Sequence, residues 1–174
     1  MKTGPNILIT GTPGVGKSTL CQHLTEHTHM DWVCVGDLAR DNNFFDGYDH
    51  ERECPIIDEE KILDELEDMI EEGNKIIDYH GCEFFPERFF DIVFVLRTDN
   101  TVLYDRLYAR GYRGKKLEDN VECEIMEILK DEALNSYQPN IIHQLNSNTH
   151  TDMENNAQKI CMWIQQWKKD NNVS

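Results

Sequence analysis

The feature that most constrains this chain is a glycine-rich segment, GTPGVGKS at residues 11–18, which fits the pattern G-x-x-x-x-G-K-[ST] in full. An apolar run at residues 6–10 precedes it, and a stretch with helical periodicity follows from Lys17. Glycines in such a turn let backbone N–H groups point inward around an anion without clashes from Cβ atoms. The segment therefore predicts a phosphate-binding loop between a strand and a helix.

The residue types of this loop indicate how it would hold a nucleotide. A helix that begins at Lys17 directs the positive end of its dipole at the phosphates. The Lys17 ammonium suits the β- and γ-phosphate oxygens, and the Ser18 hydroxyl suits Mg²⁺. We therefore expect ATP as co-substrate, Mg²⁺ as cofactor, and contacts to ATP from Gly14, Val15, Gly16, Lys17, Ser18 and Thr19.

Apolar runs alternate with amphipathic stretches along the chain, which is the pattern of an α/β fold with a parallel sheet covered by helices. Strands are predicted at residues 6–10, 32–35, 75–78, 92–96 and 141–145. Helices are predicted at residues 17–28, 58–72, 101–110 and 118–137, and a last helix is expected to open with a capping box at Thr151. Asp58 is the expected cap of the second helix and Gly73 its expected end. A chain of 174 residues corresponds to one domain, residues 1–174.

The third predicted strand ends in a carboxylate, Asp78. In phosphate-loop enzymes an acid at a strand end holds Mg²⁺, often through water, so Asp78 joins Ser18 as an expected metal ligand. His80 follows two residues later. Two roles suit its imidazole: it orients a water molecule or the phosphoryl acceptor, or it is a structural side chain bonded to a loop carbonyl.

Four segments together resemble one family of small nucleotide kinases. They are the glycine-rich loop at residues 11–19, GDLAR at 36–40, DYHGCEFFPER at 78–88 and YDRLYARGY at 104–112. These segments are similar to those of the sixth adenylate kinase isoenzyme family, whose members are also called coilin-interacting nuclear ATPases. The similarity extends over residues 5–167.

The resemblance implies a P-loop kinase fold for nucleoside monophosphates (NMPs): a five-stranded parallel sheet flanked by helices, with a short NMP-binding insertion and a short lid. It implies an adenylate kinase that transfers the ATP γ-phosphoryl group to AMP or dAMP and has an associated ATPase activity. It also implies a role in small ribosomal subunit maturation, through processing of the 18S rRNA precursor. Implied partners are a small-subunit ribosomal protein and coilin, and the implied location is the nucleus and cytoplasm.

On the acceptor side, the resemblance places the NMP-binding insertion at residues 34–57 and the lid at residues 109–119. Gly36, Asp37 and Arg40 are then expected to contact the NMP, with Arg40 at the α-phosphate of AMP.

On the ATP side, Arg106 and Arg110 are expected to lie along the nucleotide, with Arg110 on the phosphates. They share one helix face, because they are four residues apart, and a solvated helix end is the alternative interpretation. Asn148, after the fifth strand, is expected to border the adenine. The expected catalytic residues are Lys17, Asp78, His80, Arg106 and Arg110.

The chain departs from the wider adenylate kinase family at two places. The usual Asp-Gly-Phe-Pro-Arg after the third strand is replaced by DYHGC at residues 78–82, so an AMP-binding arginine is missing there. Besides Arg110, the lid carries only Arg113, Lys115 and Lys116 as cations. Lysine is a point charge without a bidentate fork, so we expect weaker stabilisation of the transferred phosphoryl group. The sequence leaves the roles of Arg88 and Arg97 open, although Arg97 ends the fourth predicted strand and strand ends in such sheets face the ligand crevice.

The charge of the chain limits its partners. Its formal net charge is -16, which disfavours binding of naked nucleic acid, because phosphate contacts need clustered Lys and Arg. No apolar run approaches membrane-spanning length, so no membrane partner is expected, and we expect a monomer. One acidic segment contains Asp41, Asp46, Asp49, Glu51, Glu53, Asp58, Glu59, Glu60, Asp64, Glu65, Glu67, Asp68, Glu71 and Glu72. It is either a solvated surface or a docking surface for a basic protein, with aromatic residues at 44–48 beside it.

Three functions remain open at this point. The first is a metabolic NMP kinase. The second is an assembly factor whose ATPase cycle releases a bound ribosomal protein, with negligible metabolic kinase activity. The third is a small-molecule kinase of the shikimate or gluconate type on the same scaffold. The GDLAR segment favours an NMP acceptor over the third, and the acidic segment and missing arginines are compatible with the second.

Overall fold

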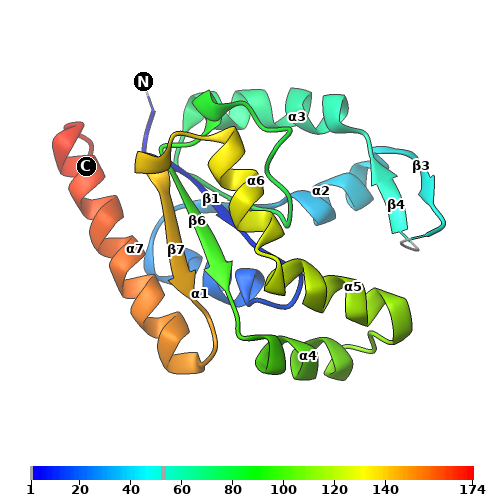
Figure 1. The fold of residues 1–174 in the computed structure, drawn as a ribbon. Coiled ribbons are helices and arrows are strands. Elements are labelled where there is room, and N and C mark those ends of the chain that lie inside the picture. Colours follow the sequence, from blue (N-terminus) through cyan, green and yellow to red (C-terminus); the bar gives the residue numbers. More distant parts are fainter. Residues whose placement is uncertain (1, 52–53) are drawn as a thin grey trace.

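The computed structural model describes residues 2–51 and 54–174; Glu53 of the acidic segment and residues 52–53 of the NMP-binding insertion lie outside the described residues. A five-stranded parallel sheet forms its centre, in the order β2-β5-β1-β6-β7 (Figure 1). The strands are β1 (Asn6–Thr10), β2 (Asp31–Cys34), β5 (Lys75–Asp78), β6 (Ile92–Arg97) and β7 (Ile142–Asn146). The five predicted strands are confirmed, with ends shifted by at most one residue.

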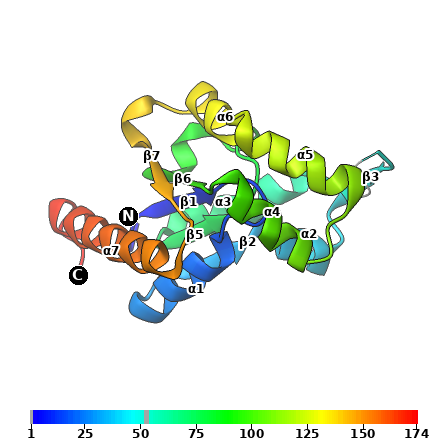
Figure 2. The ribbon, with the colours of Figure 1, turned by 60° about the horizontal axis from the view of Figure 1, so that its bottom comes forward.

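The sheet is buried on both faces, because side chains of its central strands alternate between two apolar layers. Ile7 and Ile9 of β1 belong to one layer with residues of α1 (Lys17–His27) and α7 (His150–Asp170). Leu8 belongs to the other layer, with residues of α3 (Glu59–Glu72). Figure 2 shows α1 and α7 side by side. This two-sided burial explains why the central strands are continuous apolar runs in the sequence.

The other helices are α2 (Val35–Asn42), α4 (Asn100–Ala109), α5 (Gly114–Ile125) and α6 (Ile128–Ser136), with short 3-10 turns η1 (Glu87–Phe89) and η2 (Pro139–Ile141). The predicted ends of α3 are confirmed. The Asp58 side chain accepts a hydrogen bond from the Lys61 N–H, and Gly73 follows the last turn with a φ of 84°. An Asp cap satisfies a backbone donor that has no partner within the helix, and glycine adopts this φ without strain.

The single helix predicted at residues 118–137 is wrong. The chain is helical from Gly114, and it breaks at Met126 and Glu127 before α6 begins. Glu127 has a φ of 57°, in the left-handed region. The Arg97 guanidinium donates to the Glu124 carbonyl at 2.8 Å and to the Glu127 carboxylate at 3.0 Å. Contacts from the end of β6 therefore hold the break, and local periodicity does not report them.

The predicted start of the last helix is also wrong, by two residues. Thr149, not Thr151, is the N-cap of α7. Its hydroxyl accepts from the Asp152 N–H at 3.0 Å, and the Asp152 carboxylate accepts from the Thr149 N–H at 3.3 Å. Aspartate takes the place that glutamate usually has in a capping box. Met153, Ala157, Ile160 and Ile164 form the buried face of α7, whereas Trp167 is only half-buried.

The sequence pattern did not predict the elements within residues 34–57. Helix α2 follows β2 directly, and a hairpin of β3 (Phe45–Asp49) and β4 (Cys54–Ile57) extends away from the sheet (Figure 1). Both lie within the insertion that the family resemblance assigns to the NMP. Among the described residues, no helix is long and apolar enough to cross a membrane.

Candidate nucleotide-binding site

The glycine-rich loop connects β1 to α1, as predicted. Gly14 has a φ of 93°, and a Cβ atom there would lie 2.8 Å from Leu107 and 2.9 Å from Leu103 of α4. Gly16 is the N-cap of α1 with a φ of 98°, and no side chain caps the first turn. The backbone N–H groups at this helix start are therefore available to an anion, as in other phosphate loops.

Lys17 lies in the first turn of α1 and reaches back across the loop. Its ammonium donates to the carbonyls of Gly11 at 2.7 Å and Thr12 at 3.1 Å. Burial lowers the pKa of Lys17 from its ordinary value of 10.5 to about 8, although the nearby Asp78 carboxylate acts in the opposite direction. A partly buried cation with only partial charge compensation is suited to an anionic ligand.

Asp78 ends β5, directly beside β1 and β2 in the sheet. Its side chain is buried and accepts from the Trp32 indole N–H at 3.2 Å, and the Ser18 hydroxyl lies near enough to favour the charged form of the carboxyl. Burial raises the pKa of Asp78, while the Lys17 ammonium opposes the shift. The two expected metal ligands thus lie near each other. They are hard oxygen ligands, which suit Mg²⁺ when phosphate and water oxygens complete its coordination.

Arg106 lies on α4 and is tied to the backbone of two loops. Its guanidinium donates to the carbonyls of Gly14 at 3.2 Å, Ser147 at 3.0 Å and Asn148 at 2.9 Å. Burial lowers the pKa of Arg106, and the nearby Arg110 adds to that effect. Arg106 therefore joins the phosphate loop to the loop after β7, where Asn148 lies.

Arg110 is the C-cap of α4 and is exposed. Its charge also acts on Lys17, so three cations gather near the phosphate loop. Within residues 2–51 and 54–174, the Arg110 side chain makes no hydrogen bond or ion pair. Like charges that repel one another in the free protein are a favourable arrangement for binding a polyphosphate.

On the acceptor side, Gly36, Asp37 and Arg40 lie on α2, which follows β2 at the same edge of the sheet as Asp78. The Arg40 guanidinium is 2.9 Å from the Asp37 carboxylate, and both side chains are more than half exposed. A Cβ at Gly36 would meet open space. An exposed ion pair is worth little, so an incoming phosphate can compete for Arg40.

His80 lies in the loop after β5, which α6 holds in place. The Glu132 carboxylate accepts from the N–H groups of Cys82 at 2.7 Å and Glu83 at 3.1 Å, and the Tyr137 hydroxyl donates to the Cys82 carbonyl at 2.7 Å. The exposed His80 ring lies 4.2 Å from the Tyr79 ring, between centroids. Its imidazole thus sits two residues beyond Asp78 on a loop with a defined backbone.

The other lid cations, Arg113, Lys115 and Lys116, have partners away from the phosphate loop in this structure. The Arg113 guanidinium lies 3.4 Å from the centre of the Tyr108 ring and donates to the Tyr108 and Tyr112 carbonyls. Lys115 pairs with Glu51 at 2.8 Å, and Lys116 lies over the Tyr112 ring. The segment at 109–119 also includes the first turn of α5.

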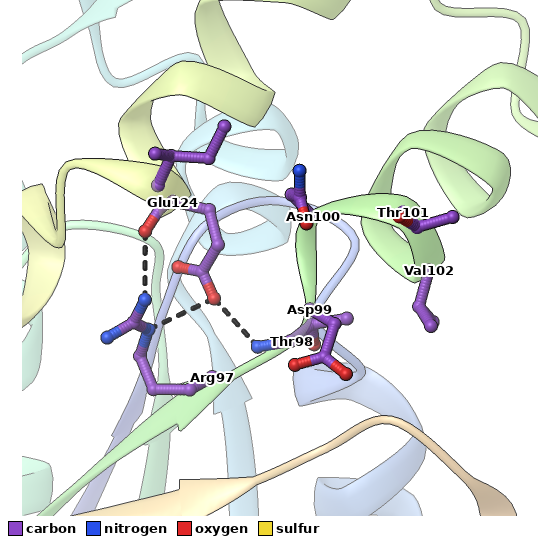
Figure 3. A pocket seen from close by; sticks show the side chains of 8 residues that line it. Arg97, Thr98, Asp99, Asn100, Thr101, Val102 and Glu124 are labelled. Carbon is purple, nitrogen blue, oxygen red and sulfur yellow. Dashed lines mark hydrogen bonds and ion pairs between the residues drawn. The ribbon is translucent and has the colours of Figure 1, made fainter.

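Sequence patterns missed a buried network on the other side of the loop. Arg97, whose role the sequence left open, pairs with Glu124 and Glu127 and lines a pocket beside them. Glu124 also lies against a pocket of about 540 Å³, which Thr98 to Val102 and Ile125 line as well (Figure 3). No motif in the sequence singles out Glu124, because the chain has 33 acidic residues and this one follows no recognisable pattern.

Comparisons with known proteins agree with this geometry. The fold is that of P-loop kinases: a shikimate kinase from Acinetobacter baumannii, solved with shikimate, superposes with a TM-score of 0.62 over 95% of each chain, at 20% identity. A family model described as an AAA domain matches residues 7–127. The adenylate kinase isoenzyme 6 homolog of Dictyostelium discoideum is 46% identical over 168 residues, covering 97% of this chain and 96% of that protein. The Saccharomyces cerevisiae protein named adenylate kinase isoenzyme 6 homolog FAP7 is 46% identical over 165 residues, covering 94% of this chain and 84% of that protein.

Fold and loop together define a P-loop nucleotide kinase. Within that class the chain belongs to the adenylate kinase isoenzyme 6 family, which confirms the resemblance seen in its motifs.

Proposed function

We propose that this protein is an ATP:AMP phosphotransferase with an associated ATPase activity. The observation that carries the proposal is the phosphate loop, in which Lys17 crosses the loop and Ser18 lies near the buried Asp78. Family membership implies ATP as the phosphoryl donor and typically Mg²⁺. Ser18 and Asp78 would hold that ion, which would neutralise charge on the phosphates when bound.

The residues of the ATP side act mainly by positioning and electrostatics. The loop N–H groups and the start of α1 bind the phosphates, and Lys17 and Arg110 stabilise charge on the transferred group. Arg106 keeps the phosphate loop and the Asn148 loop at a fixed separation through its carbonyl contacts, so that one nucleotide contacts both.

The acceptor enters from the side of α2. Arg40 leaves Asp37 to bind the α-phosphate of AMP, since a phosphate offers two oxygens to its planar fork. His80 orients the phosphoryl acceptor, or a water molecule when no acceptor is bound, which accounts for kinase and ATPase activities at one site. Shikimate is the competing acceptor to test, because a shikimate kinase solved with shikimate has the same fold.

The proposal is tested with the purified protein, ATP and Mg²⁺ in coupled assays with AMP, dAMP, CMP, UMP, GMP and shikimate. We expect ADP formation above the ATPase background with AMP and dAMP only. Replacing Arg40 by alanine should then raise the KM for AMP by about tenfold or more and change the KM for ATP less than twofold, because the lost contact is on the acceptor side.

Arg88→Ala is the matched control, because Arg88 is equally exposed and paired with Glu67 of α3. It should leave both KM values unchanged. Equal effects of Arg40→Ala on both substrates would contradict its placement, and turnover with shikimate alone would contradict the proposed acceptor.

A second function rests on the charge of the molecule. We propose that the protein also acts as an assembly factor in small ribosomal subunit maturation and 18S rRNA precursor processing. In this role it is a monomer that binds a basic small-subunit ribosomal protein, in the nucleus and cytoplasm. Coilin is a further proposed partner. Exposed acids of α3 and the hairpin support this function, since a net charge of -16 attracts basic chains and repels naked RNA.

Replacing Glu59, Glu60, Asp64 and Glu67 by their amides should weaken capture of a small-subunit ribosomal protein. In the parent protein, capture should fall steeply with salt, because exposed charges are screened beyond roughly 8–10 Å. AMP should compete, since the acidic segment adjoins Arg40. The measurement is a pull-down at rising salt, with and without AMP and ATP.

The control carries the same change of charge on other helices, with amides in place of Glu118, Asp119, Glu122 and Asp131, which are also exposed. It should retain capture. Equal losses in both variants, or tight binding of naked RNA by the parent, would show that the acidic segment is not the docking surface.

A further inference from the structure

The buried carboxylate of Glu124, on α5, contacts the phosphate loop and is not among the residues expected to bind the nucleotide. Glu124 lies near the end of α5 and is 3% exposed. One of its oxygens accepts from the Thr12 hydroxyl at 3.1 Å, and the other accepts from the Thr98 N–H at 2.7 Å and from the Arg97 Nε at 3.1 Å (Figure 3 shows the last two). Both carboxylate oxygens thus have partners, and Arg97 compensates the charge.

Thr12 is held from two directions. Its side chain is fully buried and donates to Glu124, and its carbonyl accepts from the Lys17 ammonium at 3.1 Å. The Thr12 backbone therefore links the anchor on α5 to the lysine expected to contact ATP. Deleting either side-chain partner would leave a buried polar group unpaired and free the loop to move.

The position of Glu124 along α5 gives the contact a further consequence. Helix α5 begins at Gly114, inside the expected lid, and Glu124 is its penultimate residue. Just beyond it, the chain breaks at Met126 and Glu127, and Arg97 holds the broken turn through the Glu124 carbonyl at 2.8 Å. The C-terminal end of α5, the helix that begins within the lid, is thus fixed both to the end of β6 and to the phosphate loop.

We propose that Glu124 is a positioning residue for the phosphate loop, acting through the Thr12 hydroxyl to hold the loop in its ATP-binding conformation. The inference deepens the proposed function and rests on ATP being the ligand of this loop. In this proposal Glu124 does not contact the nucleotide. It fixes Thr12, whose carbonyl accepts from Lys17, and it thereby ties α5 to the phosphate loop.

The test is a double-mutant cycle of Thr12→Val, Glu124→Gln and the double variant, with ATP affinity measured by calorimetry. Each single change should weaken ATP binding by about five- to tenfold, and the double variant should lose no more than the worse single one, because both changes remove one interaction. Amide hydrogen exchange of residues 11–17 in the ligand-free protein should be faster in all three.

Two controls separate positioning from general destabilisation. Glu127→Gln removes the other ion pair of Arg97 without changing a contact to the phosphate loop. Its ATP affinity and the amide hydrogen exchange of residues 11–17 should equal those of the parent protein. Thr12→Ser retains the hydroxyl and should restore most of the affinity lost in Thr12→Val. If Glu124→Gln does not fold, the Val and Ser variants of Thr12 still decide.

The proposal would be overturned if Thr12→Val bound ATP and exchanged the amide hydrogens of residues 11–17 as the parent protein does. Additive losses of ATP affinity in the double variant would also overturn it. A parent protein that binds no ATP would instead overturn the proposed function. In that case the exchange of residues 11–17 decides the role of Glu124: faster exchange in Thr12→Val and Glu124→Gln supports it, and parent exchange refutes it.

Discussion

Replacing Lys17 by alanine should lower phosphotransfer by on the order of a thousandfold while the protein stays folded. The change removes the cation that lies against the Gly11 and Thr12 carbonyls and that is expected to move to the β- and γ-phosphates of ATP. The apolar layers of the core do not include Lys17, so the fold should survive. Steady-state rates and thermal unfolding of the same preparation check both parts. A folded variant with parent activity would refute the phosphate-loop assignment.

The same lysine should leave a pH signature that the alanine variant lacks. With a pKa lowered to about 8 by burial, free Lys17 is protonated at pH 6.5 and mostly neutral at pH 9. Phosphate oxygens favour the charged form, so binding above pH 8 must take up a proton. ATP affinity should therefore fall as pH rises, by up to about tenfold per unit above 8. Calorimetry in two buffers of different ionisation enthalpy should detect proton uptake at pH 8.5 in the parent and none in Lys17→Ala.

The parts of this molecule that the sequence predicted are those with a local physical cause. The phosphate loop needs glycines and a lysine at fixed spacing, and the buried strands need continuous apolar runs, so residues 6–18 and 92–96 could be assigned from their own pattern. Asp78 could be placed because a strand end and a loop end meet at one edge of a parallel sheet. The Asp58 cap of α3 was equally local, since its partner is three residues away.

The parts that the sequence did not predict depend on residues far apart in the chain. The break between α5 and α6 is held by Arg97, some thirty positions earlier, and the periodicity of residues 118–137 continues through it. Arg106 was expected along ATP, and its three carbonyl partners lie on two loops that only the fold brings together. Thr149 was missed as the cap of α7 because Thr151 offers a similar local pattern two residues later. Such choices are settled by tertiary contacts rather than by propensity.

Asp78 should be the residue through which Mg²⁺ acts. Replacing it by alanine should lower activity by about a hundredfold and make the remaining activity insensitive to added Mg²⁺, because Ser18 alone is a weak ligand. The change also removes the carboxylate that raises the pKa of Lys17 most, so the pKa of that lysine should fall further. Asp78→Asn keeps an oxygen for the Trp32 and Ser18 contacts, which separates loss of the metal ligand from loss of packing.

His80→Ala is the comparison that isolates the role of the loop after β5. If His80 orients water or the acceptor, this variant should hydrolyse ATP at least tenfold more slowly and bind ATP with parent affinity, since the phosphate loop is untouched. The backbone of its loop should persist, because Glu132 and Tyr137 hold it through Cys82 and Glu83. Its response to Mg²⁺ should stay that of the parent, unlike Asp78→Ala. Hydrolysis rates measured beside calorimetric ATP affinities decide the matter, and a parent rate of hydrolysis in His80→Ala would make the imidazole a structural side chain.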